Sequence, residues 1–212
     1  MKIGILGSGV VGNALARGFL SREQEVKIGS RTPGKINLKE LSTVYGDRIS
    51  AGTFKEAAEY GEMLIMCCLG SAVEDVIGLS GKENFNGKVL IDATNQLDFS
   101  KGKQPGMIYG LDKSLGQIVQ SHLPDAKVVK CFNTVPSSQM VDPVFKDADM
   151  LICGNDPGAK KTVTDLLKQF GWRNSIDIGG IENAIWLEAL VPLWLRIGTS
   201  INNWNHVVKF LY

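Results

Sequence analysis

Three glycines near the start of the chain, Gly7, Gly9 and Gly12, have the spacing of a turn that binds phosphate groups. The apolar residues 3–6 precede them, and a helix-forming segment, residues 11–20, follows. The first backbone N–H groups of a helix have no partner within the helix and can bind an anion. Gly7 permits the tight turn, Gly9 lets a pyrophosphate reach the backbone, and Gly12 lets helix and strand approach closely. The predicted pyrophosphate site is Gly7, Ser8, Gly9, Val10, Val11 and Gly12.

The residues that follow the second predicted strand, 25–29, indicate which dinucleotide binds. NAD-binding sites usually have Asp or Glu here, which accepts hydrogen bonds from the ribose 2′-hydroxyl. This chain has Ser30, Arg31 and Thr32 instead, followed by Lys35. A guanidinium binds a 2′-phosphate through its forked donors, and hydroxyl and ammonium groups add donors and positive charge. The pattern therefore favours NADP(H) over NAD, with a solvated cationic face as the alternative.

Three later strand ends carry residues that could hold the rest of the ligand. In open α/β sheets, ligands lie at the carboxyl ends of the strands. Cys68 and Leu69 close one predicted strand, Thr94 and Asn95 follow the next, and residues 133–137 follow another. We expect their polar groups and amides to hold the nicotinamide ribose and carboxamide. Since Asn and Thr are also common turn formers, a purely structural turn is the alternative at each position.

Strand and helix patterns alternate along the whole chain. Strands are predicted at residues 2–6, 25–29, 49–51, 63–68, 88–92, 126–131, 150–153 and 175–178. Helices are predicted at residues 11–20, 35–45, 53–60, 72–79, 115–122, 158–171 and 182–211, the last with breaks at Gly198 and Asn202-Asn203. This order predicts an α/β fold, a Rossmann-type doubly wound, mostly parallel sheet with a short C-terminal helical extension. Residues 1–180 are expected to form the NADP-binding domain, and residues 181–212 an extension packed on it or on a partner chain.

Composition narrows the range of partners. The chain of 212 residues has 23 basic and 22 acidic side chains, which gives a formal net charge of +1. This balance excludes the excess of positive charge that is typical of nucleic-acid-binding domains, and it excludes a polybasic patch for a membrane surface. No apolar stretch reaches the roughly 18 residues of a membrane span, and no secretory signal is visible, so we expect a cytoplasmic protein without a membrane partner. The four cysteines form no CxxC pair and have no histidine at metal-ligand spacing, which favours reduced thiols and no metal site.

Five segments together resemble a known family. They are residues 3–12, Gly29-Ser30-Arg31 with Lys35, residues 132–136, residues 151–156 and residues 188–193. With them the chain resembles the NADP oxidoreductases that depend on the deazaflavin coenzyme F420, and the related oxidoreductase domains of metalloreductases. The resemblance implies NADPH bound at residues 8–12, Ser30, Arg31 and Lys35, with further contacts near Leu69, Val73, Asn95 and Ser137, and we add Cys68 to this set. It also implies a deazaflavin stacked on the nicotinamide under the C-terminal helices.

The pocket for this second substrate is expected at Asn133, Thr134, Val135 and Trp194. The chain differs from the archaeal members of the family by carrying Asn133 where they have a histidine. Trp194 lies on one predicted helix face with Trp186 and Leu190, a pattern that suits core or dimer packing as well as an apolar wall for a flat ring.

The predicted function is hydride transfer between the nicotinamide and a planar acceptor, such as a deazaflavin or a flavin. Two alternatives stay open: an NADPH-dependent reductase of small imines or carbonyls, and a non-catalytic NADP(H) sensor. Hydride transfer between two flat rings requires alignment and exclusion of water more than it requires an acid–base pair. We therefore assign no catalytic side chain from the sequence, and we expect a small-molecule substrate and a homodimer.

Overall fold

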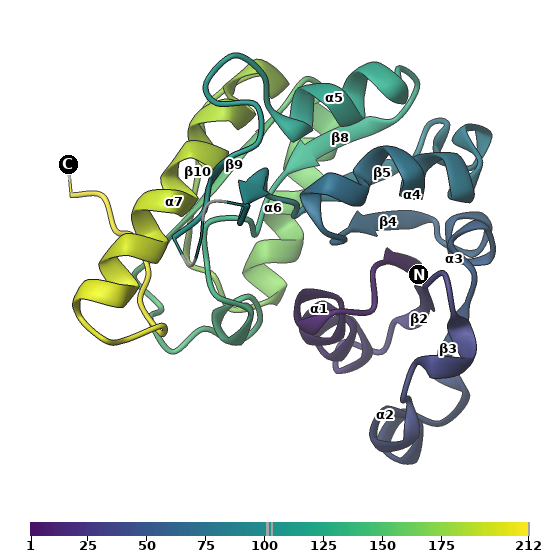
Figure 1. Ribbon diagram of the computed structural model, residues 1–212. Helices are drawn as coiled ribbons and strands as arrows, with labels where there is room; N and C mark the ends of the chain where they lie inside the picture. The colour runs from purple at the N-terminus through teal and green to yellow at the C-terminus, as the bar shows by residue number, and fades with distance from the viewer. Residues whose placement is uncertain (101, 103, 212) are drawn as a thin grey trace.

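A single eight-stranded sheet forms the centre of the computed structural model, which describes residues 1–100, 102 and 104–211 (Figure 1). The strands lie in the order β10-β9-β8-β5-β4-β1-β2-β3. Their bounds are β1 Lys2–Leu6, β2 Glu25–Gly29, β3 Ile49–Gly52, β4 Met63–Met66, β5 Val89–Asp92, β8 Lys127–Lys130, β9 Asp149–Gly154 and β10 Asn174–Asp177. Each neighbouring pair is parallel except β8 and β9. The predicted α/β fold with a mostly parallel sheet is confirmed.

Helices cover both faces of the sheet. They are α1 Val10–Leu20, α2 Lys39–Tyr45, α3 Phe54–Tyr60, α4 Val73–Ser80, α5 Leu115–His122, α6 Pro157–Gln169 and α7 Ala184–Ser200. Side chains from α1 and α6 share one buried cluster, and those from α3, α4, α5 and α7 share another. Within β4, Met63 and Ile65 join the first cluster while Leu64 and Met66 join the second. This alternation is what a strand buried on both faces requires.

Shorter elements complete the chain. The 3₁₀ turns are η1 Pro33–Lys35, η2 Gly46–Arg48, η3 Gly70–Ala72, η4 Lys82–Phe85, η5 Ser137–Gln139 and η6 Ile181–Asn183. A separate two-stranded antiparallel ladder pairs β6 Leu97–Asp98 with β7 Gly106–Met107, and the sequence analysis did not predict it. Two helix starts carry local sequence signals: Thr53 forms a capping box with Glu56, and Asp156 accepts a 2.7 Å hydrogen bond from the Ala159 amide.

Two helix predictions are wrong in extent. Residues 35–45 are not one helix, because the chain is extended at Ile36 and the Asn37 side chain accepts the Lys39 amide, so α2 begins only at Lys39. The helical region predicted for residues 182–211 ends at Ser200, so its predicted break at Asn202-Asn203 is confirmed but no helix follows it. Asn202 has a positive φ of 48° and the Asn203 amide returns to the Gly198 carbonyl, a hydrogen bond that ends the helix. Gly198 lies within α7 and does not break it.

The segment after α7 folds back along the helix instead of extending it. The ring of His206 stacks on Trp194 at 4.3 Å, and its two ring nitrogens lie 2.9 Å and 3.1 Å from the carbonyl oxygens of Asn203 and Trp194. The Phe210 amide donates to the Asp149 carboxylate at 2.6 Å, which ties the segment to the start of β9. Within the described residues, no helix has the length and apolar character needed to cross a bilayer.

His206→Ala should release this C-terminal segment without unfolding the sheet. Losing the stacked ring and its hydrogen bonds raises the population of the detached segment, so exchange of the Phe210 amide should accelerate about tenfold. Hydrogen exchange followed by mass spectrometry or NMR measures this. The control is His122→Ala, which removes the second histidine of the chain, at the end of α5, and should leave the exchange rate of the Phe210 amide unchanged. An unchanged rate in His206→Ala would show that the stack does not hold the segment.

Candidate active site

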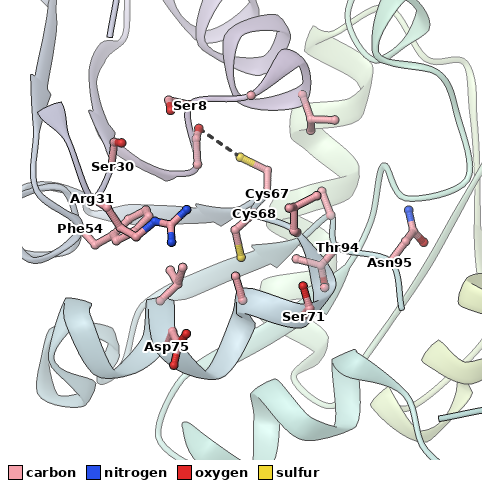
Figure 2. Close-up of a pocket in the computed structure, with 18 of the residues that line it drawn as sticks. Ser8, Ser30, Arg31, Phe54, Cys67, Cys68, Ser71, Asp75, Thr94 and Asn95 are labelled. Carbon is pink, nitrogen blue, oxygen red and sulfur yellow. Dashed lines mark hydrogen bonds between the residues drawn. The ribbon is translucent and has the colours of Figure 1, made fainter. Parts of the chain in front are cut away.

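A cavity of about 890 Å³ lies along the carboxyl ends of β1, β2, β4 and β5. Figure 2 shows side chains from the glycine turn, from the end of β2 and from the segments after β4 and β5 arranged around it. The structure brings ten of the predicted site residues to its wall: Gly7, Ser8, Gly9, Val10, Val11, Ser30, Arg31, Cys68, Leu69 and Asn95. Residues far apart in the sequence therefore meet at one edge of the sheet, as the strand order requires.

The glycine turn packs as closely as the sequence pattern requires. Gly7 has a φ of +144°, which side chains rarely adopt, and a Cβ there would lie 2.8 Å from the Cys67 carbonyl oxygen. A Cβ on Gly12 would overlap the carbonyl oxygen of Gly7. By contrast, a Cβ on Gly9 would meet no atom within 4 Å. Gly9 is the N-cap of α1 and makes no side-chain cap, so the first-turn amides of the helix remain able to bind an anion.

Positive charge gathers at the end of β2. Figure 2 shows the Arg31 guanidinium directed from this strand end into the cavity. A smaller recess of about 280 Å³ adjoins it and is lined by Ser8, Asn13, Ser30, Thr32 and Lys35, among others. In the described part of the chain, no acidic side chain forms an ion pair with Arg31 or Lys35. Both cations are therefore available to a phosphate group.

At the opposite end of the cavity, Asn95 lines the wall and pairs with Asn133, which is buried behind it. Asn133 Nδ2 donates to Asn95 Oδ1 at 3.0 Å and to the Leu187 carbonyl at 3.1 Å, while Asn95 Nδ2 donates to the Asn133 carbonyl at 3.1 Å. The remaining atom, Asn133 Oδ1, is buried and has no hydrogen-bond partner. Asn133 is absent from the cavity wall, so Asn95 is the member of the pair placed to meet a polar ligand group such as a carboxamide. Pyrophosphate amides, a cationic end and an amide end together fit a dinucleotide such as NADP(H).

Strained backbone precedes this asparagine pair. Phe132 is fully buried and has a positive φ of 65°, which is uncommon for a bulky side chain. Its ring packs 6.1 Å from that of Phe170. Non-glycine residues in this conformation cost free energy and gather at functional sites, where the surrounding packing holds them. Here the left-handed turn redirects the chain at the end of β8, immediately before Asn133.

Several predicted residues lie outside the cavity wall. None of the predicted residues Gly12, Val73, Asn133, Thr134, Val135 and Ser137 lines the cavity: the first five are buried and Ser137 begins η5. Thr32 and Lys35 line only the smaller recess. Trp194 is also elsewhere, because its ring stacks on His206 and its Nε1 donates to the His206 carbonyl. The contacts predicted for these residues remain predictions.

The sequence analysis missed part of the wall. Phe54, Gly70, Ser71, Leu97 and Phe99 also line the cavity. Leu97 belongs to the unpredicted β6, and Phe99 follows it with a half-exposed ring. No motif marks these positions, although an exposed aromatic ring after a strand end is a signal that could have been used.

The thiols near the cavity are poor nucleophiles. Burial, with a smaller contribution from the charge of Asp92, raises the pKa of Cys68 from 9.0 to about 12. Burial also raises the pKa of Cys67, whose Sγ lies 3.5 Å from the Gly7 carbonyl oxygen. All four cysteines are free thiols, and the described residues contain no His, Cys, Asp and Glu cluster placed to hold a metal.

The fold and the cavity define a Rossmann-type dinucleotide-binding protein, and comparison with known proteins gives its family. The family model described as NADP oxidoreductase coenzyme F420-dependent matches residues 2–96. The F420-dependent NADP reductases of Methanocaldococcus jannaschii and Methanothermobacter marburgensis are 33% and 32% identical, each across 93% of this chain and 92% of the relative. A solved structure from Arthrobacter sp. FB24, described as a candidate F420-dependent NADP reductase, has a TM-score of 0.93 and 34% identity over the full length of both chains.

The chain therefore belongs to the family of F420-dependent NADP oxidoreductases, and it is an NADP-dependent oxidoreductase. The predicted relation to metalloreductases is confirmed by 25% identity to metalloreductase STEAP3 of Rattus norvegicus, across 91% of this chain and 38% of that protein. A reductive aminase of Aspergillus terreus has a TM-score of 0.67 at 20% identity, a likeness of fold alone.

Gly9→Ala and Gly12→Ala should separate ligand binding from folding. The methyl group of Gly9→Ala has free space, so the thermal midpoint should hold while the Kd for NADP⁺ rises at least about tenfold, because the methyl occupies the approach to the backbone. Gly12→Ala should instead lose about 1–3 kcal/mol of stability through overpacking. Calorimetric titration and thermal unfolding measure the two effects. Unaltered NADP⁺ binding by Gly9→Ala would contradict the pyrophosphate site.

Alkaline pH should destabilise the protein partly through Cys68. Since the folded state raises this pKa from 9.0 to about 12, the folded protein binds the thiol proton more tightly than the unfolded chain. The resulting stability is complete below about pH 9 and is lost as the pH rises toward about 12. Thermal unfolding at stepped pH should show a shallower decline for Cys68→Ala than for the wild type. Ser71→Ala, in the same cavity wall, should follow the wild type, and a Cys68→Ala profile parallel to the wild type would refute the prediction.

Proposed function

We propose that this protein transfers a hydride between NADP(H) and coenzyme F420. The observation that carries the proposal is one continuous cavity that joins the α1 amides, the Arg31 guanidinium and Asn95, whose side chain pairs with the buried Asn133. The names of the two archaeal reductases support F420 as the acceptor, since each is similar to this chain across 93% of its length. A flavin or another planar ring is the broader class to which this acceptor belongs.

The chain's own contribution is binding, alignment and exclusion of water. NADP(H) supplies the hydride chemistry, which needs two rings held close and parallel in a dry pocket. The glycine turn would hold the pyrophosphate, Ser30, Arg31, Thr32 and Lys35 would hold the 2′-phosphate, and Asn95 with Asn133 would meet the carboxamide. Leu69, Leu97 and Phe99 give this end of the cavity an apolar wall, against which a flat acceptor could pack. The hydride step itself moves no proton, and the proton that completes the reduced dihydro ring comes from solvent, so we assign no acid or base.

The acceptor assay is the direct test. With purified protein and NADPH, the nicotinamide absorbance should fall when oxidised F420 is added, because the two rings then exchange a hydride. Free flavin, a ferric chelate and a cyclic imine are the comparison acceptors, and each should react much more slowly. Fast oxidation by the imine would instead identify a small-molecule reductase. Tight NADPH binding with no oxidation by any acceptor would identify a sensor and overturn the proposal.

Arg31→Asp tests the assignment of the nucleotide. Replacing the guanidinium by a carboxylate removes charge-assisted hydrogen bonds to a 2′-phosphate and adds repulsion, so the Kd for NADPH should rise about 100-fold. NADH has no 2′-phosphate, so its Kd should change by less than about threefold. Fluorescence titration with both nucleotides measures the difference. Arg173→Asp, at an exposed ion pair with Asp147, is the matched control and should change neither Kd. Equal losses for both nucleotides would contradict NADP specificity.

Three further points remain proposals. We propose that α7 and the segment after it form an extension of the nucleotide-binding domain, that the protein is cytoplasmic, and that it is a homodimer. Exposed apolar side chains on α7 at Trp186, Leu193 and Ile197, with Ile201 just beyond it, recur at helical spacing and support pairing with a second copy. Sedimentation of the wild type against Leu193→Asp decides the oligomeric state.

A further inference from the structure

Three charged side chains are buried together directly beneath the amide end of the cavity. Lys130 and Asp92 have no exposed surface and Glu188 has 1%. Lys130 Nζ lies 3.0 Å from Asp92 Oδ2, 2.7 Å from Glu188 Oε1 and 2.6 Å from the Thr94 carbonyl oxygen. These three acceptors match the three N–H groups of an ammonium. We name these side chains, Asp92, Lys130 and Glu188, the buried triad.

Every remaining acceptor of the buried triad is also used. Asp92 Oδ1 accepts the amide and the hydroxyl of Thr94 at 2.9 Å and 2.6 Å. Glu188 accepts the amides of Leu115 and Gly116 at 2.9 Å and 3.1 Å, at the first turn of α5. The positive end of α5 therefore offsets the second carboxylate. Burial opposes the charge of Lys130, but the two carboxylates outweigh it and raise its pKa, so the lysine stays cationic.

Stability alone does not account for such a cluster. Taking three charges out of water costs several kcal/mol per ion, and apolar replacements of similar volume are often neutral or stabilising. What the buried triad provides is a fixed geometry between elements. Asp92 and Lys130 are register partners on β5 and β8, and Glu188 joins them to α7 and α5.

The buried triad and the asparagine pair use the same three segments. Asn95 follows Asp92 by three residues, Asn133 follows Lys130 by three, and the Leu187 carbonyl that accepts from Asn133 precedes Glu188. Lys130 also holds the Thr94 carbonyl, directly before Asn95. A shift of any of these segments would therefore move Asn95, which lines the cavity, or the Asn133 side chain that is hydrogen-bonded to it.

We propose that the buried triad of Asp92, Lys130 and Glu188 is a positioning device that fixes Asn95 and Asn133 for alignment of the nicotinamide. Lys130 is a positioning residue in this account, because it holds the Thr94 carbonyl and reaches no cavity wall itself. Glu188 lies on α7 and its carboxylate contacts Lys130, so the position of the final helix also affects where Asn95 and Asn133 lie. The inference rests on the proposed hydride transfer for its kinetic consequence only.

The test compares a neutral form of the buried triad with a distant ion pair. The triple variant Asp92→Asn, Lys130→Met, Glu188→Gln removes all three charges while keeping side-chain shapes close to the originals. Lys160→Met is the matched control, since it breaks the Lys160–Asp177 pair at the far edge of the sheet. Single-turnover oxidation of NADPH by F420 at saturation measures hydride transfer, and titration with NADP⁺ measures binding.

We expect the triple variant to fold and to bind NADP⁺ within about threefold of the wild type, yet to transfer hydride about 10- to 100-fold more slowly, because small misplacements of reacting groups cost this much. Lys160→Met should match the wild type in both measurements. A folded triple variant with wild-type hydride transfer overturns the proposal. Should the triple variant not fold, Glu188→Gln alone replaces it and should give a slower transfer with retained binding.

A second readout does not depend on turnover. In protein with ¹⁵N-labelled asparagine, the side-chain amide signals of Asn95 and Asn133, assigned by Asn95→Ala and Asn133→Ala, should shift on addition of NADP⁺. In the triple variant the NADP⁺-induced shifts should differ from those of the wild type, because the amides are held differently, while Lys160→Met should reproduce the wild-type shifts. If the wild type proves inactive with F420, the proposed function fails, but this measurement still decides the positioning role. NADP⁺-induced shifts in the triple variant that are the same as in the wild type would then overturn it.

Discussion

The closeness with which α1 approaches β1 and β4 is the constraint on which the site depends. A side chain at Gly7 would meet the Cys67 carbonyl, and one at Gly12 would meet Gly7 itself. Only glycine at both positions lets the helix begin directly at the carboxyl edge of the sheet, with its unpaired amides at the cavity. Once this edge is an anion site, the order β4-β1-β2 places Arg31 on one side of it and the residues after β4 and β5 on the other.

The two ends of the cavity use charge in opposite ways. At the end of β2, Arg31 and Lys35 are exposed and available to a ligand. Exposed charges of this kind contribute little to the stability of the free protein. When a phosphate binds, they form several charge-assisted hydrogen bonds to it. At the other end the charges of the buried triad are fully enclosed and satisfy one another, and the neutral amide of Asn95 lines the cavity wall. This division suits a nucleotide that has an anionic end to be bound and a reactive end to be aligned.

Much of the framework could be predicted from the sequence because its signals are local. Apolar runs mark β1 and β4, Thr53 and Asp156 mark helix starts, and Gly7 to Gly12 mark the turn. The contacts that could not be predicted join distant segments. Asn133 reaches Asn95 across 38 residues, and Glu188 reaches the Leu115 amide across 73. The break at Asn202-Asn203 could be predicted, but the path of the chain beyond it could not, since it depends on tertiary contacts of Trp194 and His206.

A crystal structure of the protein with NADP⁺ bound tests the central claim most directly. The account predicts the pyrophosphate on the first-turn amides of α1, with the 2′-phosphate within hydrogen-bond distance of the guanidinium beyond β2. A nucleotide bound away from that helix end would contradict it. So would an Arg31 guanidinium directed into solvent that makes no contact with the 2′-phosphate.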